Sequence, residues 1–274
     1  ITFARMNRIL FIAVLLLCGC NEGENQQTEA PKVDPEMINA SPAKQFALNM
    51  SEAHRVDSFQ NLGALSFDLE LTFRGKKRFE GRLMSTTSSD RIIVRRRKDA
   101  SILLYNGEKV LLYPDTADWK YGRFDIFTWQ YFALAPFKLT DPGTHWSEYK
   151  KLPLFGDSLN TAKLSFSENT GDAPDDWYIA YQDDSTGLLA GMAYIVTYSK
   201  DQKEAEKSPH AITYHDYVQI EGSWVPRVWR FWDWSEAGLG DQIGEGRLKR
   251  LQTVPVTDKR KLFAIPRPYI ELER

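Results

Sequence analysis

The sequence predicts a mainly β protein that is built around one curved antiparallel sheet. Three observations support this prediction. Segments in which apolar and polar residues alternate recur along most of the chain. The connections between them are short and rich in Gly, Asn, Asp and Ser. No regular alternation of strands with helices occurs, which argues against a parallel nucleotide-binding sheet.

The chain begins with a segment that has the character of a signal peptide. Residues 9–17 are all apolar and follow Arg5 and Arg8. A membrane-spanning helix needs about 20 apolar residues, roughly twice the length of this run. We therefore expect residues 1–19 to be a cleaved signal peptide rather than a membrane anchor.

The segment Leu17-Cys18-Gly19-Cys20 resembles the bacterial lipobox. The resemblance implies that Cys20 is lipidated and becomes the first residue of the mature chain, while Cys18 leaves with the signal. The two or three acyl chains that such a cysteine carries would hold the protein on a membrane almost permanently. We expect an envelope protein anchored outside the cytoplasm, and Asn21 after the cysteine favours the outer membrane, facing the periplasm.

Residues 20–42 are expected to form a flexible tether. They are polar and acidic and include three prolines, so they cannot bury a core. A tether of about 20 residues reaches roughly 25 Å. With Cys20 lipidated, the chain has no free thiol, which excludes disulfides, thiolate catalysis and Cys-ligated metals.

The remaining residues, 43–274, fit one medium-sized domain. The net charge of the chain is −2, which argues against nucleic acid as a partner. One basic run, residues 95–98, is flanked by Asp90 and Asp99. We interpret it as the solvated end of a strand rather than as a phosphate site.

The domain is expected to start with a helix and continue as a strand meander. Residues 41–59 have apolar residues at helical spacing after a Ser-Pro start, which predicts one amphipathic helix. Residues 67–73 then alternate strictly, and the Arg-Gly-Lys turn at 74–76 leads into a returning strand. In all we expect about eleven strands. Their ranges are 67–73, 77–86, 91–97, 101–107, 109–115, 161–167, 177–183, 188–199, 210–220, 223–235 and 244–254.

One helix is predicted to interrupt the meander. Residues 125–137 follow Asp125 as the expected N-cap and are apolar on nearly all sides. A helix without a polar face must be enclosed. We therefore expect it to cover the concave face of the curved sheet.

The strand at 223–235 is apolar on both faces. Trp229 and Phe231 project to one side, and Trp232 and Trp234 to the other. One side can pack a core helix while the other lines a cavity in an open or half barrel, or the helix can fill the barrel completely. Candidate cavity residues are Phe67, Leu69, Leu71, Phe73, Phe127, Trp129, Phe132, Trp229 and Phe231.

Two stretches resemble the LolA/LolB-type lipoprotein carrier superfamily, and in particular an uncharacterised group of bacterial lipoproteins with such a domain. They are the hairpin NGEKVLLYPD at 106–115 and the strand pair DYVQIEGSWVP at 216–226. The resemblance covers residues 43–255. It implies an incomplete antiparallel barrel of about eleven strands, with helices over the concave face and an apolar cavity that takes acyl chains in the carriers. Residues 135–160 and the C-terminal KLFAIPRPYIELER have no counterpart in that pattern.

Catalysis is not expected. His210 and His215 face opposite sides of one strand and cannot chelate one metal, and His54 is expected to cap a helix or to face solvent. No nucleophile elbow, zinc motif or phosphate-binding glycine loop occurs. The pairs at 175–176 and 183–184 are interpreted as turn-forming aspartates. We therefore predict no enzyme, no metal and no cofactor.

Two hypotheses about function remain. The first is a membrane-tethered domain that binds or carries an amphiphile, such as a lipid or the acylated end of another lipoprotein. Burying about 14 methylene groups would contribute on the order of 10 kcal/mol before ordering costs. The second is a structural or sensory interaction protein with a filled barrel, acting through outer loops such as residues 141–157.

Overall fold

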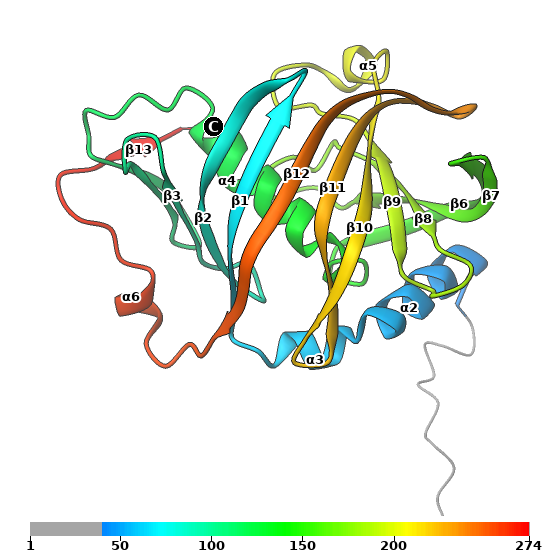
Figure 1. Cartoon of the computed structure of the whole chain (residues 1–274), viewed down its shortest axis with the longest axis horizontal. Coiled ribbons are helices and arrows are strands. Elements are labelled where there is room, and N and C mark those ends of the chain that lie inside the picture. The colour runs from blue at the N-terminus through cyan, green and yellow to red at the C-terminus, as the bar shows by residue number, and fades with distance from the viewer. Residues whose placement is uncertain (1–39, 274) are drawn as a thin grey trace, which may run out of the picture. The chain divides into compact units, whose positions relative to one another are not determined.

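Thirteen strands form one open antiparallel sheet in the computed structural model, which describes residues 40–273. The order across the sheet is β13-β5-β4-β3-β2-β1-β12-β11-β10-β9-β8-β7-β6, so β13 and β6 are edges and the barrel is incomplete, as expected. Figure 1 shows the strong curvature of the sheet. The strands are β1 (Ala64–Phe73), β2 (Lys76–Thr86), β3 (Ile92–Arg96), β4 (Ile102–Tyr105), β5 (Val110–Tyr113), β6 (Thr144–Leu154), β7 (Asp157–Phe166), β8 (Tyr178–Gln182), β9 (Leu189–Tyr194), β10 (His210–Ile220), β11 (Ser223–Ser235), β12 (Gly238–Val254) and β13 (Ile270–Leu272).

The predicted turns connect the predicted strands. Arg74 and Gly75, with φ angles of 48° and 75°, join β1 to β2. Glu221 and Gly222, at 48° and 86°, join β10 to β11 in the same way. Two consecutive residues with positive φ form the tight hairpin turn that suits the twist of paired strands.

The strand count of about eleven is too low because β6 and β13 were not predicted. They arise from the two segments that have no counterpart in the sequence resemblance, and they form the two edges of the sheet. Most of β6 is exposed, so its residues carry little apolar alternation, and β13 has only three residues. The expectation of an outer loop at 141–157 is therefore wrong, because Thr144–Leu154 is a strand.

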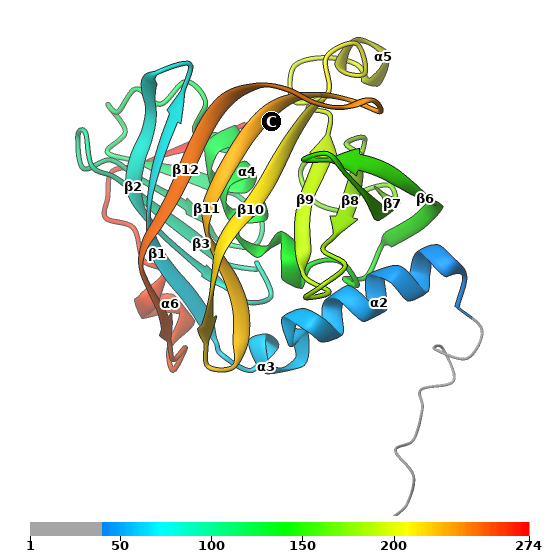
Figure 2. The ribbon, with the colours of Figure 1, turned by 45° about the vertical axis from the view of Figure 1, so that its right-hand side comes forward.

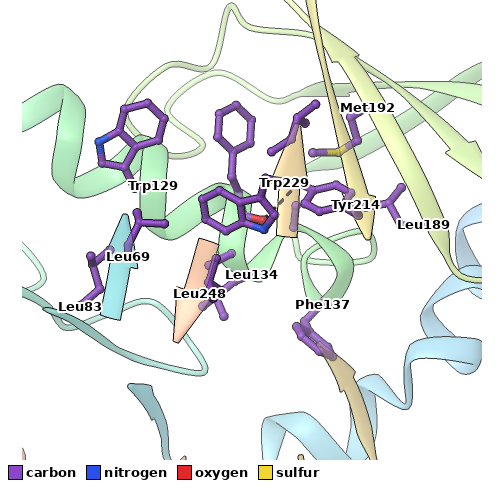
Figure 3. Packing of buried hydrophobic residues seen from close by; sticks show 14 of the residues in the cluster. Leu69, Leu83, Trp129, Leu134, Phe137, Leu189, Met192, Tyr214, Trp229 and Leu248 are labelled. Atoms are coloured by element: carbon purple, nitrogen blue, oxygen red, sulfur yellow. Dashed lines mark hydrogen bonds between the residues drawn. The ribbon is translucent and has the colours of Figure 1, made fainter. Parts of the chain in front are cut away.

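The inserted helix lies inside the curve of the sheet (Figure 2). It comprises α4 (Gly122–Leu134), followed by the 3-10 helix η1 (Ala135–Phe137). Figure 3 shows Trp129 and Leu134 of α4 among side chains from the strands, including Trp229. On β12, Gly246 makes room for this packing, because a Cβ atom there would lie 2.8 Å from Leu71 and 2.9 Å from Trp229.

Two further helices run along one end of the strands (Figure 1). They are α2 (Pro42–His54), which the Ser41 side chain caps as predicted, and α3 (Val56–Gln60). Arg55, with φ of 59°, separates them, so the expected single helix is divided in two. Phe59 of α3 stacks on Phe137 of η1 with ring centroids 3.7 Å apart, which joins this end of the molecule to the inserted helix.

The convex face is also covered at both ends of the sheet. The hairpin formed by β6 and β7 packs its Leu152 and Leu154 against Trp234 of β11. At the other end, Phe263 and its neighbours in the C-terminal segment pack on Ile93 of β3 and on adjacent strands. This segment contains the short helix α6 (Lys259–Leu262), and the remaining helix, α5 (Gln202–Ala205), lies between β9 and β10. Strands such as β3 and β11 are therefore apolar on both faces because protein covers both.

Candidate functional site

The nine cavity candidates fall into two groups. Phe127 and Phe132 line a cavity beside α4. The other seven belong to the core or pack against it, and none of them lines either of the two cavities described below. They are Phe67, Leu69, Leu71, Phe73, Trp129, Trp229 and Phe231. Contact between these seven residues and a ligand would require α4 to move.

Helix α4 has two apolar faces with different surroundings. Residues such as Ile126 and Trp129 are buried against the sheet. Phe124, Phe127 and Tyr131 recur at spacings of three and four residues, so they share the opposite face, and all three line the cavity. The all-round apolar character of this helix thus has a physical reason, because one face fills the barrel and the other forms a cavity wall.

A buried carboxylate holds α4 in place. Asp125 is fully buried and accepts hydrogen bonds from both terminal nitrogens of Arg78, at 2.6 and 3.2 Å. It also accepts from the indole N–H groups of Trp119, at 2.8 Å, and Trp129, at 2.9 Å. The predicted N-cap role of Asp125 is wrong, because the helix begins at Gly122 and the carboxylate lies within its first turn. Four donors instead compensate the burial of this charge.

The cavity has a volume of about 530 Å³, which is within the range of small-molecule sites. Helix α4 forms one wall, and Phe166 of β7, Tyr178 of β8 and Tyr194 of β9 belong to the other. The loop between β7 and β8, residues 169–173, and the segment after η1 also contribute to the lining, as do Ser88, Ile92 and Tyr105 from the β2–β3 turn, β3 and β4. The cavity thus lies between the inserted helix and one end of the curved sheet.

Aromatic rings of α4 and of strands β7 to β9 contact one another within the lining of the cavity. Tyr131 lies 5.1 Å from Tyr178 and 6.4 Å from Phe166, measured between ring centroids. Tyr194 lies 6.2 Å from Tyr178 and 5.0 Å from Phe132. Such rings offer a large apolar surface, with polar atoms only at the tyrosine hydroxyls.

The polar groups of the cavity include one unusual carboxyl. The Oδ1 atom of Asp176 accepts hydrogen bonds from the backbone N–H and the hydroxyl of Thr197, at 2.8 and 2.7 Å. Burial raises the pKa of Asp176 to about 6, against the opposing effect of these two hydrogen bonds. A carboxyl with such a perturbed pKa in a cavity is a candidate binding group.

Two ion pairs also contribute to the lining. Arg123 of α4 and Asp172 of the β7–β8 loop lie 2.5 Å apart, and Arg123 also donates to the backbone oxygen of Leu272. Lys138, which follows η1, lies 3.0 Å from Asp141 and donates to the backbone oxygen of Thr87. These pairs tie the loops around the cavity to α4 and to the β2–β3 turn.

Sequence reasoning missed Asp176, Tyr178 and Tyr194 as site residues. The pair 175–176 was interpreted as turn-forming, and Asp176 does donate its N–H to Ala173 in a turn. Its side chain nevertheless lines the cavity. The available signal was the period of two, because residues 176, 178 and 180 share one face of an extended chain. For the pair at 183–184 the interpretation is confirmed, since Asp183 accepts from the backbone N–H groups of Ser185 and Thr186.

The structure places His54 in the core of the domain. His54 is buried rather than capping or solvent-facing, which corrects the expectation. Its Nε2 accepts from the N–H of Leu189, at 2.9 Å, and its Nδ1 lies 3.1 Å from the oxygen of Trp224. Burial lowers its pKa to about 4, so the ring is neutral and links α2 to β9 and β11. Within residues 40–273, no group of three or more His, Cys, Asp or Glu side chains is placed to hold a metal.

A second cavity of about 560 Å³ lies near the turn between β6 and β7. Its lining includes Phe155, His215 and Trp224, and Phe155 is 54% exposed. Ring contacts of Phe155 with His215 and Trp232 hold the tip of the hairpin against the sheet. Nine of its fourteen lining residues are apolar or aromatic, but within the described part of the chain it contains no cluster of contacting rings like that beside α4.

The predicted signal peptide, residues 1–19, the lipidation site Cys20 and the tether up to residue 39 lie outside the described residues. Among the helices of residues 40–273, none has the length and apolar character needed to cross a membrane.

No protein-family model and no curated protein matches the sequence. Solved structures match by fold. A LolA superfamily protein from Nitrosomonas europaea aligns with a TM-score of 0.53 at 10% identity, covering 82% of this chain and 99% of that one. A candidate outer membrane lipoprotein-sorting protein domain from Vibrio parahaemolyticus gives 0.47 at 10% identity, with coverages of 77% and 93%. A DUF1329 family protein from Desulfovibrio piger gives 0.43 at 10% identity, with coverages of 80% and 96%. Residues 40–273 therefore form a domain with a LolA-like fold, as the sequence resemblance implies.

Proposed function

We propose that this protein binds or carries an amphiphile in the cavity between α4 and strands β7 to β9. The observation that carries the proposal is the pairing of a 530 Å³ cavity with a wall of contacting aromatic rings inside the concave face. The apolar wall would bury a lipid chain or the acyl chain of a lipoprotein, and each buried methylene group contributes about 0.8 kcal/mol. Binding of this kind needs no catalytic residue, so the proposed function is not enzymatic.

The proposal includes the cellular location that the N-terminal sequence predicts. Cys20 would carry the lipid anchor, and residues 21–42 would hold the domain near the surface of a membrane, outside the cytoplasm and facing the periplasm. The cavity would then face a source of lipids at short range. The likeness to a LolA superfamily protein supports a carrier-type fold, and the membrane and the ligand are part of the proposal.

The alternative function, a structural or sensory protein with a filled barrel, is favoured by the packing of seven cavity candidates in the core, with Trp129 of α4 among them. Trp129 of α4, for example, lies 6.3 Å from the ring of Phe231 and fills the centre of the concave face. The cavity on the other face of α4 remains open. The two functions therefore differ in whether that region takes a ligand.

A cavity-filling variant tests the proposal. Thr128 lies on α4 and lines the cavity, so a Thr128→Trp substitution would place an indole in the binding volume. Thr257→Trp is the matched control, because Thr257 is exposed and does not line the cavity. Native mass spectrometry after gentle extraction should show a co-purifying lipid on the parent and on Thr257→Trp, with much less on Thr128→Trp. A bare mass for the parent, together with no uptake of a fluorescent fatty-chain probe, would refute the proposal and favour the filled-barrel function.

A further inference from the structure

One carboxyl in the cavity has no cationic partner. Asp176 uses Oδ1 for both hydrogen bonds from Thr197, and within residues 40–273 no group donates to its Oδ2 atom. None of the ion pairs among these residues includes Asp176. Buried carboxylates are normally paired with a cation or with several donors, as Asp125 is in the same protein. Asp176 is half-buried, and its Oδ2 atom has no protein donor within residues 40–273 and remains accessible to solvent or to a ligand.

Three tyrosine hydroxyls share this environment. Tyr178 and Tyr194 are more than nine-tenths buried and Tyr131 is partly buried, yet in the described chain none of their hydroxyls has a hydrogen-bond partner. Burial raises the pKa of each, and the nearby charge of Asp176 adds to the increase in all three. They are consequently neutral phenols whose oxygens can accept hydrogen bonds beside a carboxylate.

We propose that the ligand of this cavity carries an ammonium group, which binds Asp176 and the neighbouring tyrosines while its apolar chain lies along α4. An ammonium group has donors but no acceptor, and it matches a site made of a carboxylate and phenol oxygens. Aromatic rings also attract cations through their faces. This inference rests on the proposed function and narrows its substrate class.

Anionic ligands fit this subsite less well. A fatty acid would bring its carboxylate toward the ionised Asp176, and like charges in a poorly solvated cavity repel each other. The cationic side chains of the lining, Arg123 and Lys138, are both already in ion pairs. The source of the ammonium group can be a free long-chain amine or the headgroup of a lipid such as one bearing ethanolamine.

The test compares ligands of equal chain length below their micellar concentrations, using isothermal titration calorimetry at pH 8. Dodecylammonium, dodecanol and dodecanoate share a twelve-carbon skeleton and carry a cationic, a neutral and an anionic headgroup, respectively. The wild-type protein should bind dodecylammonium about 10- to 100-fold more tightly than dodecanol, and dodecanoate most weakly. Lysophosphatidylethanolamine and lysophosphatidylglycerol of equal chain length then separate the sources. Tighter binding of lysophosphatidylethanolamine would show that the ammonium group comes from a lipid headgroup. Equal affinity for the two lysolipids, together with tight binding of dodecylammonium, would show that it comes from a free long-chain amine.

Asp176→Asn is the corresponding variant, because the amide oxygen can still accept from Thr197. It should lose the preference for dodecylammonium while it keeps its affinity for dodecanol, which also reports on folding. Asp175→Asn removes the same charge from the adjacent, exposed residue and should change the preference by less than about twofold. Equal affinity of the wild type for dodecylammonium and dodecanol would overturn the inference but leave the proposed function standing, whereas no binding of any chain would overturn both.

A pH series gives an independent result. Dodecylammonium keeps its charge between pH 5 and 8, while Asp176, with its pKa of about 6, becomes protonated at the lower end. Affinity should therefore fall as the pH drops, and Asp176→Asn should abolish this dependence. The other titratable or charged groups around this site are Asp175, Glu108, the three tyrosines, the Lys138–Asp141 and Arg123–Asp172 pairs, and His210, which contacts Tyr194. A slope that persists in Asp176→Asn would assign the effect to one of these groups and contradict the role of Asp176.

Discussion

Removing the carboxylate of Asp125 should destabilise the fold strongly. In Asp125→Ala, Arg78 loses a bidentate partner and two indole N–H groups, from Trp119 and Trp129, lose their acceptor. The side chain of Arg78 is 32% exposed, so water can partly restore its hydration. The indole groups are buried, and each unsatisfied donor costs about 1–3 kcal/mol. Together these effects predict a loss of about 3–5 kcal/mol in the free energy of unfolding.

Urea unfolding followed by circular dichroism measures this loss. Asp125→Asn keeps one oxygen as an acceptor and should lose about half as much, while Asp175→Ala, at an exposed site, should stay within about 0.5 kcal/mol of the parent. A double-mutant cycle with Arg78→Met should show less destabilisation than the sum of the single changes, because both break the same pair. If Asp125→Ala unfolds within about 0.5 kcal/mol of the parent, the carboxylate does not hold α4, and the reasoning is wrong.

Substitutions at three further positions test how individual buried residues affect stability. His54 has a pKa of about 4 in the fold against about 6.5 unfolded, so the unfolded chain binds the extra proton between these values. The contribution of His54 to the free energy of unfolding should be complete above pH 6.5 and should fall by about 3 kcal/mol toward pH 4. In urea titrations, His54→Gln should show a weaker dependence of the free energy of unfolding on pH. Asp176 titrates in the opposite sense, because its raised pKa makes the ionised form unfavourable in the fold. Asp176→Asn should therefore increase the urea midpoint at pH 8 and not at pH 4, and an unchanged midpoint at pH 8 would contradict its burial. Gly246→Ala should lower the free energy of unfolding by about 1–3 kcal/mol, because its Cβ would meet Leu71 and Trp229. An unchanged melting temperature would show that the core is less tightly packed here than the structure indicates.

The sequence allowed the fold class to be predicted because the inner strands alternate clearly. Residues 67–73 bury their apolar side chains in the core, as the alternation predicts, whereas of the acidic residues only Glu70 is partly exposed and Asp68 is buried in ion pairs with Arg82 and Arg250. The edge strands β6 and β13 could not be recognised, since an exposed or very short strand carries little apolar periodicity. The covers of the convex face were missed for a related reason. A strand that is apolar on both faces shows that something covers it, but not which segment does so.

The candidate site was predicted only in part. The apolar helix was located correctly, and Phe127 and Phe132 do line the cavity. The N-cap assignment of Asp125 was wrong because capping depends on backbone geometry, which the residue type alone does not determine. The carboxylate instead accepts four hydrogen bonds, from Arg78, Trp119 and Trp129. Asp176 was overlooked because an aspartate next to another aspartate and a proline commonly indicates a turn. Its position in the cavity depends on a tertiary hydrogen bond from Thr197 and on the tyrosines of α4, β8 and β9 that line the same cavity.

The location of a bound chain tests the central claim most directly. A long-chain amphiphile with a photoreactive diazirine in its chain should be irradiated with the purified protein, and the adducts mapped by peptide mass spectrometry. The proposed cavity predicts adducts within residues 88–92, 105–108, 122–144, 166–178 and 194–198, and their loss in Thr128→Trp but not in Thr257→Trp. Adducts confined to other surfaces, or equal labelling of both variants, would show that no ligand enters the space between α4 and strands β7 to β9.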